Sequence, residues 1–213
     1  MLTLAIQAGG ESRRMGEDKA LKPFLGRPLI VHLLERLGEI ADEILITTNR
    51  PEAYAFLGKR LVSDLMPGRG ALGGLYTALA AARQPLVAVV ACDMPFASRE
   101  FFLRACQWML EGDWDVVVPR SEAGYEPLHA LYRRGTCLPA VKAALDAGAW
   151  RVITWFDQVR VREVTEAEMR SLDPSGRAFW NVNTPEEFAQ AEEVMRKEMG
   201  GVDEGSEAFG REL

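Results

Sequence analysis

The sequence contains few of the residues that build disulfide-stabilised or zinc-centred proteins. Three cysteines and two histidines occur among 213 residues, and the cysteines are widely spaced with no CxxC pair. Disulfide frameworks and zinc sites need clustered cysteine or histidine, so we expect neither. Long apolar runs are also missing, since none approaches the roughly 18 residues that span a bilayer. Because no basic leader precedes the first apolar run, we expect a cytoplasmic protein that does not bind membranes.

The chain also lacks a sustained basic face. Its formal net charge is −6, of which residues 200–213 contribute −3 through four acidic residues and one arginine. The remainder is nearly neutral, so nucleic acid is not an expected partner and a small molecule is. We expect a single domain over residues 1–199, long enough to bury a full core, followed by a disordered acidic tail over residues 200–213.

Short β-rich runs alternate with longer helical patterns along the chain. The predicted strands cover residues 2–8, 43–49, 60–64, 86–92 and 115–119, with further candidates at 128–133 and 159–164. The predicted helices cover residues 28–41, 70–82, 99–112, 140–148 and 184–199, the last capped by Thr184 and Glu187. This order predicts an α/β fold, in which an open, largely parallel sheet carries helices on both faces. In such folds ligands bind beyond the carboxyl ends of the strands.

The first predicted strand breaks directly into the segment GGESRRMGEDKAL, residues 9–21. Gly9 and Gly10 let the backbone approach an anion, and a turn at this point leaves N–H groups unpaired. Arg14 and Lys19 add positive charge that suits phosphate oxygens. The spacing fits neither the P-loop nor the dinucleotide-binding pattern. We therefore predict a polyphosphate site built on a third kind of loop.

Polar residues follow three later strands and are predicted to meet this loop at one edge of the sheet. Asp93 comes directly after the strand at 86–92, where a carboxylate suits Mg²⁺, a cation that takes oxygen ligands and bridges to phosphates. Asn49 and Asp64 close two other strands, and their side chains are able to bind a base or a ribose. For each of the three, a structural role in a turn is the alternative.

Two further segments allow both a ligand-binding and a packing interpretation. The glycines of GALGGL, residues 70–75, offer bare backbone to a flat ring, or else allow a helix to pack closely on the sheet. Asn181 and Asn183 stand two residues apart, so in an extended segment both amides point to the same face and suit a polar heterocycle. A turn before the closing helix also uses Asn.

Five motifs, in this order, resemble the molybdenum cofactor guanylyltransferases, which attach GMP to molybdopterin. The motifs are AGGESRRMGEDKAL, GALGGL, CDMPF, EPLHALY and NVNTPEE, and the likeness covers about residues 2–195. It implies a three-layer α/β/α sandwich with a mostly parallel, Rossmann-like sheet. It also implies a magnesium-dependent transfer of GMP from GTP to molybdopterin or the molybdenum cofactor, with release of pyrophosphate. Transient contacts with proteins that deliver or accept the cofactor are implied as well.

The same resemblance implies roles for individual residues. Lys19, Arg14 and Asp93 would act on the transferred phosphate, with Lys19 binding the phosphates and Asp93 holding Mg²⁺. The other implied contacts are with the nucleotide, through Gln7, Ala8, Gly9, Gly10, Asn49 and Asp64, and with the pterin, through Asn181 and Asn183. Gln7 departs from the leucine usual in the family, and Gly73 from the more usual alanine.

Three other functions are compatible with parts of the pattern. A molybdopterin cytidylyltransferase usually has Ala-Ala-Gly where this chain has Ala8-Gly9-Gly10 and lacks the GALGGL type of segment, so guanine is favoured. A sugar-phosphate nucleotidyltransferase has a longer opening loop. A non-catalytic module that binds GTP or the molybdenum cofactor for delivery needs neither Lys19 nor Asp93, whose presence favours an enzyme.

Overall fold

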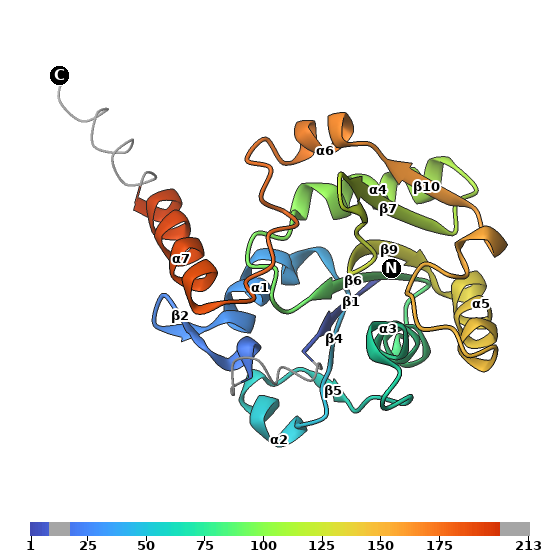
Figure 1. Ribbon diagram of the computed structural model, residues 1–213, viewed down its shortest axis with the longest axis horizontal. Coiled ribbons are helices and arrows are strands. Elements are labelled where there is room, and N and C mark those ends of the chain that lie inside the picture. The colour runs from blue at the N-terminus through green and yellow to red at the C-terminus, as the bar shows by residue number, and fades with distance from the viewer. Residues whose placement is uncertain (9–17, 201–213) are drawn as a thin grey trace.

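The computed structural model describes residues 1–8 and 18–200, and its centre is an eight-stranded sheet (Figure 1). Seven strands follow the order β10-β7-β9-β6-β1-β4-β5, and β8 pairs with β7. Their bounds are β1 Leu2–Gln7, β4 Glu43–Thr47, β5 Arg60–Val62, β6 Leu86–Ala91, β7 Val116–Ser121, β8 Gly124–Tyr125, β9 His129–Arg133 and β10 Val161–Val164. The predicted strands are all present, with ends that differ by at most two residues.

The sheet is mostly parallel, as predicted, with one inverted strand in its main path. β1 runs parallel to both β4 and β6, β4 to β5, and β10 to β7. β9 is antiparallel to its neighbours β6 and β7, and β8 is antiparallel to β7. Because β9 is antiparallel to both β6 and β7, these two strands run in the same direction, and β7 therefore runs in the direction of β1.

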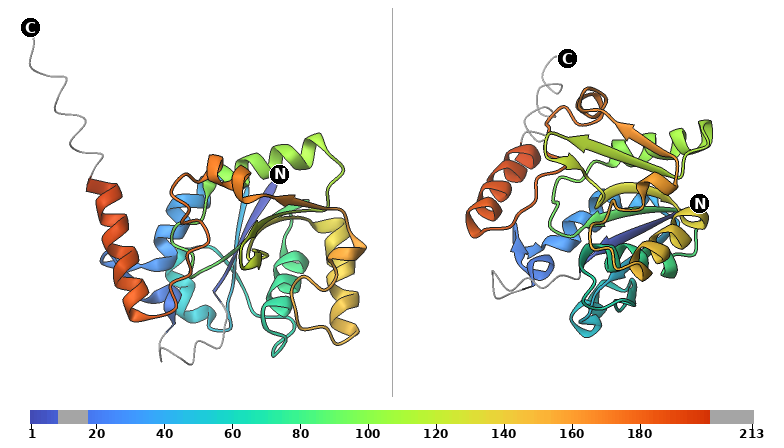
Figure 2. Two further views of the ribbon diagram at one scale, coloured as in Figure 1. Left: turned by 45° about the horizontal axis from the view of Figure 1, so that its top comes forward. Right: turned by 45° about the vertical axis from the view of Figure 1, so that its right-hand side comes forward.

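Helices cover both faces of the sheet, which gives the predicted three layers. Leu4 and Ile6 of β1 pack into a core with α1, α4 and α6, whereas Ala5 faces a second core with α3 and α5. Figure 2 shows α3 and α5 on the opposite side of the sheet from α1. The bounds are α1 Leu29–Leu37, α2 Pro51–Tyr54, α3 Gly70–Ala81, α4 Arg99–Glu111, α5 Arg134–Asp146, α6 Glu166–Leu172 and α7 Pro185–Gly200. None of these described helices has the length and apolarity to cross a membrane.

The closing helix α7 begins where the sequence predicts. The Glu187 N–H donates to the Thr184 hydroxyl at 3.1 Å, and the Thr184 N–H donates to the Glu187 carboxylate at 3.0 Å. These reciprocal bonds form the predicted capping box. Of the predicted acidic tail, residues 201–213 lie outside the described part of the chain.

A small third core joins α7 to a hairpin formed by β2 (Pro23–Phe24) and β3 (Arg27–Pro28). The rings of Phe24 and Phe188 meet edge to face with centroids 5.3 Å apart. The Leu25 N–H, at the hairpin tip, donates to Glu192 at 2.6 Å. The last helix of the fold therefore packs on an element near its beginning.

α5 begins at Arg134 rather than at residue 140, so the sequence prediction of this helix is wrong at its start. Pro139 suggests a first turn, but in the structure it lies inside the helix. Contacts with Asp115, a residue outside the helix, stabilise the first turn of α5. The Thr136 hydroxyl donates to the Asp115 carboxylate at 2.7 Å, and the Cys137 thiol donates to the Asp115 carbonyl at 3.2 Å.

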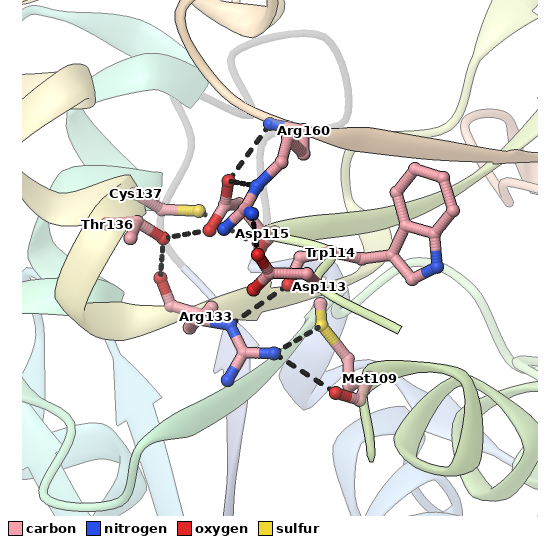
Figure 3. Close-up of polar contacts among 8 residues, drawn as sticks. All are labelled: Met109, Asp113, Trp114, Asp115, Arg133, Thr136, Cys137 and Arg160. Atoms are coloured by element: carbon pink, nitrogen blue, oxygen red, sulfur yellow. Dashed lines mark hydrogen bonds and ion pairs between the residues drawn. The ribbon is translucent and has the colours of Figure 1, made fainter. Parts of the chain in front are cut away.

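Asp115 is the centre of a polar cluster at the amino end of β7 (Figure 3). Its side chain is nearly buried and accepts hydrogen bonds from the Thr136 hydroxyl at 2.7 Å and the Arg160 backbone N–H at 2.9 Å. The Arg160 guanidinium adds a contact at 3.2 Å. The amino end of β7 is at the edge of the sheet opposite the carboxyl ends of β1 and β6. We therefore interpret this cluster as a structural tie between β7, α5 and β10.

Candidate functional site

The predicted site residues gather beyond the carboxyl ends of four parallel strands. Gln7 is the last residue of β1, Asn49 and Asp64 each stand two residues after β4 and β5, and Asp93 stands two residues after β6. These strands are neighbours in the sheet, in the order β6-β1-β4-β5. Gly9, Gly10 and Arg14 lie outside the described residues.

Lys19, Asp93 and Asn183 meet at this edge although they are far apart in the sequence. The Lys19 ammonium donates to the Asn183 side-chain oxygen at 2.8 Å and lies 3.8 Å from an Asp93 carboxylate oxygen. The Val182 N–H donates to the Asp93 carbonyl at 2.9 Å, which holds the segment before α7 against the end of β6. The Lys19 and Asp93 side chains are only 14% and 22% exposed. This cation is thus placed in a sheltered position beside a carboxylate and an amide.

The Asp93 carboxylate is sheltered and has few hydrogen-bond donors around it. Burial raises the pKa of its carboxyl above the ordinary value, and the nearby Lys19 ammonium opposes part of that rise. Within residues 1–8 and 18–200, the Asp93 carboxylate accepts a hydrogen bond only from its own backbone N–H. The same residues contain no group of three or more His, Cys, Asp and Glu side chains that could hold a metal ion. A single carboxylate suits Mg²⁺, which keeps several waters and completes its ligand set with phosphate oxygens.

Asn49 and Asp64 are joined to each other. The Asp64 N–H donates to the Asn49 side-chain oxygen at 3.0 Å. One carboxylate oxygen of Asp64 accepts from the Met66 N–H and from the Thr77 hydroxyl, both at 2.9 Å. The structure thus brings two predicted nucleoside residues together, and it adds Thr77 of α3, which the sequence analysis did not identify.

Tyr54 and Asp18 are two further residues that sequence reasoning missed. The buried Tyr54 hydroxyl donates to the Asp18 carboxylate at 2.7 Å and lies 3.5 Å from the Ala8 carbonyl oxygen. Burial, followed by the Asp18 carboxylate, raises the pKa of Tyr54, so this hydroxyl stays protonated as a donor. Ala8 and Asp18 are the last and first described residues around the predicted phosphate loop. Tyr54 is the last residue of the short helix α2, and a tyrosine at that position gives no sequence signal for such a contact.

The glycines of GALGGL allow close packing, one of the two interpretations left open by the sequence. A Cβ on Gly73 would lie 2.7 Å from the Met66 carbonyl oxygen, and one on Gly74 would lie 2.8 Å from the Gln7 side-chain oxygen. The Gln7 side chain is 7% exposed, and its amide nitrogen has no hydrogen-bond partner within the described chain. Gln7 therefore extends under α3 in the space that Gly74 leaves.

The two asparagines before α7 have different contacts. Asn183 binds Lys19 as described, whereas the Asn181 amide donates to the Phe179 carbonyl at 3.0 Å within its own segment. Residues 181–183 pair with no strand of the described chain. Of the pair, only Asn183 is brought to the Lys19 cluster by a described hydrogen bond.

The known proteins to which this chain is similar in sequence have names that agree with one another. The profile of the MobA-like NTP transferase domain matches residues 4–161. The chain is 34% identical, over 92% of its length and 96% of the relative, to a molybdenum cofactor guanylyltransferase from Desulfosudis oleivorans. It is 39% identical, over 89% of its length and 91% of the relative, to a probable molybdenum cofactor guanylyltransferase from Pelotomaculum thermopropionicum.

Solved structures show that the fold is shared more widely. Molybdopterin-guanine dinucleotide biosynthesis protein A from Archaeoglobus fulgidus superposes with a TM-score of 0.78 at 24% identity, covering 92% of this chain and 99% of that one. A 4-diphosphocytidyl-2C-methyl-D-erythritol synthase from Anaerococcus prevotii gives a TM-score of 0.68 at 14% identity, covering 92% and 98%. Proteins with different names thus share this sheet, and the choice of nucleotide has to be argued from the site and the sequence.

Proposed function

This chain belongs to the family of MobA-like NTP transferases, and on that basis we propose that it transfers GMP from GTP to the molybdenum cofactor and releases pyrophosphate. The observation that carries the transfer chemistry is the cluster of Lys19, Asp93 and Asn183 at the carboxyl edge of the sheet. The choice of guanine rests on the guanylyltransferases that match this chain over about nine-tenths of its length.

In the proposed reaction, an oxygen of the terminal phosphate of molybdopterin attacks the α-phosphorus of GTP. The new P–O bond forms as the bond to the bridging oxygen breaks, and the bonding electron pair leaves with pyrophosphate. The attacking phosphate is already ionised at neutral pH, so no general base is required. The protein then has to position two anions and offset their charge. Lys19 supplies a cation for this, and its bond to Asn183 restricts where that cation lies.

Asp93 is the residue that we propose to hold Mg²⁺, because its carboxylate is partly buried and accepts no hydrogen bond from another residue of the described chain. When bound, Mg²⁺ would offset negative charge on the phosphates. Lys19 lies 3.8 Å from Asp93, so both positive groups would act at the same place.

We also propose that the pterin binds on the side of Asn181 and Asn183, which precede α7. The Lys19–Asn183 hydrogen bond supports this, since it links the residue proposed for the phosphates to one proposed for the acceptor. Gln7, Ala8, Asn49 and Asp64 remain the proposed nucleotide contacts. The cytoplasmic location and the transient protein partners expected from the sequence stay predictions.

A ligand-dependent thermal shift tests the nucleotide. The protein is heated with GTP, CTP, ATP or UTP, each with Mg²⁺, because a bound ligand stabilises the folded state by RT ln(1 + [L]/Kd). We expect the largest shift with GTP. A larger shift with CTP would instead assign the chain to the cytidylyl branch.

Pyrophosphate release separates an enzyme from a carrier. The protein is incubated with GTP and Mg²⁺, with and without molybdopterin. We expect pyrophosphate only when the acceptor is present. A GTP-dependent thermal shift without any pyrophosphate would favour the binding and delivery module.

A further inference from the structure

Thr77 lies inside α3, beyond every motif that the sequence analysis singled out. Its side chain is fully buried, and its oxygen lies 2.9 Å from an Asp64 carboxylate oxygen, 2.9 Å from the Gly73 carbonyl oxygen and 3.0 Å from the Leu65 nitrogen. A hydroxyl carries one proton, so it donates to one of the two oxygens and accepts from the Leu65 N–H. The ionised carboxylate is the stronger acceptor, which directs the proton to Asp64.

The two oxygens of the Asp64 carboxylate differ in their hydrogen bonds. One oxygen accepts both described bonds, from the Met66 N–H and from Thr77. The other has no hydrogen-bond partner among residues 1–8 and 18–200. A carboxylate held by one oxygen in this way keeps a fixed orientation, and its second oxygen is available to accept from a ligand hydroxyl or N–H group.

The same arrangement includes Asn49. Its side-chain oxygen accepts from the Asp64 N–H, so the backbone and the side chain of Asp64 are each held by a different element. The local alternative is that Thr77 bonds only back to Gly73, as hydroxyl residues in helices often do. That alternative accounts neither for the Leu65 N–H that donates to the Thr77 oxygen nor for the 2.9 Å approach of this hydroxyl to the Asp64 carboxylate.

We propose that Thr77 is a positioning residue, which fixes the Asp64 carboxylate in the orientation that binds the nucleoside part of the nucleotide. This inference rests on the proposed function, since it takes Asp64 to be a nucleotide contact. It adds a residue of α3 to the site and gives that helix a second role besides close packing through its glycines.

A pair of matched variants tests the proposal. Thr77→Val keeps the branched shape and removes the hydroxyl, whereas Thr77→Ser keeps the hydroxyl and removes a methyl group. Nucleotide affinity is measured by calorimetry in the presence of Mg²⁺, at a temperature where thermal unfolding shows each variant to be folded. We expect Thr77→Val to weaken binding about tenfold, the scale of one hydrogen bond to a charged group, and Thr77→Ser to bind within about threefold of wild type.

A double-mutant cycle with Asp64→Ala separates positioning from a general effect on the helix. If Thr77 acts through Asp64, Thr77→Val has no further effect on affinity once the carboxylate is gone. An unchanged affinity in Thr77→Val, a failure of Thr77→Ser to restore binding, or an equal loss in the Asp64→Ala background would each overturn the proposal.

The cycle is also run so that an error in the proposed function is recognised. Wild-type protein is titrated first with all four nucleotides, and the cycle uses whichever one it binds. A preference for another base would therefore correct the proposed function and still test Thr77. If wild type binds none of them, both the proposed function and this inference are wrong.

Discussion

At the scale of single residues, Asp93 and Lys19 form a charge pair in which one member is proposed to bind a metal. We predict that Asp93→Asn folds normally, needs far more Mg²⁺ and loses most GMP transfer, because a neutral amide is a poorer ligand for a hard cation. The measurement is a Mg²⁺ titration of the transfer rate, with circular dichroism to check folding.

The control for that variant is Asp157→Asn, which removes an exposed carboxylate from the 3₁₀ turn Phe156–Gln158. It should leave the Mg²⁺ dependence unchanged. If Asp93→Asn also shows the wild-type dependence, Asp93 is not the metal ligand, and Asp64 is the next carboxylate to test.

A substitution at Gln7 is expected to increase the stability of the protein. Its buried amide nitrogen lacks a partner in the described chain, and an unpaired buried donor costs about 1–3 kcal/mol. Gln7→Leu, which is similar in size, should therefore raise the free energy of unfolding by about 1 kcal/mol in denaturant titrations. Gln158→Leu, at an exposed glutamine, should change it by less than about 0.5 kcal/mol. A loss of stability in Gln7→Leu would mean that the amide is paired.

At the scale of elements, the strands were predictable because they are short β-rich runs, several of them continuous and apolar, that alternate with longer helical patterns. The start of α7 was predictable because Thr184 and Glu187 form a capping box within four residues of each other. α6, which is not among the predicted helices, carries the same signal in Thr165 and Glu168. The reversed direction of β9 has no local signal, since it depends on which strands its neighbours are.

The Asp115 cluster is where element-scale contacts predict a measurable stability. Asp115→Ala would leave the Thr136 hydroxyl and the Arg160 N–H without their acceptor and should lower the free energy of unfolding by about 2 kcal/mol. Asp113→Ala removes the other, 81% exposed carboxylate that pairs with Arg160, and should cost less than about 1 kcal/mol. Denaturant titration measures both. Equal losses would show that the hydrogen bonds of Asp115 contribute little.

At the scale of the whole molecule, we predict that His129 makes the free energy of unfolding depend on pH. Burial lowers its pKa from 6.5 to about 3, and its Nε2 accepts from the Ser98 N–H at 2.9 Å. Between pH 6.5 and 3 the unfolded chain binds a proton that the folded chain does not. Stability from this group is therefore complete above pH 6.5 and is lost as the pH falls, by about 2 kcal/mol between pH 6.5 and 5.

The measurement is the free energy of unfolding against pH, in wild type and in His129→Phe. The variant loses the Ser98 bond and should be less stable than wild type above pH 6.5, yet its stability should fall less steeply below that pH. Parallel curves for the two proteins would show that His129 does not titrate on unfolding.

The candidate site was only partly predictable from the sequence, because some of its contacts join residues that are distant along the chain. Strand ends mark Asn49, Asp64 and Asp93, because polar residues there stand out against apolar runs. Thr77 and Tyr54 join the site through contacts with residues 13 and 36 positions away. Such contacts exist only once the sheet has assembled, so the local sequence does not predict them.

The packing of α7 on the β2–β3 hairpin has a consequence for the order in which the protein matures on the ribosome. Lys19 is translated before its partner Asn183 and before the helix α7 that follows Asn183. The sheet pairs of β1, β4 and β6 can all form before that, so a nascent chain would acquire its fold first and its complete lysine environment last. Until translation passes Asn183, the nascent chain would lack the amide that restricts the Lys19 ammonium.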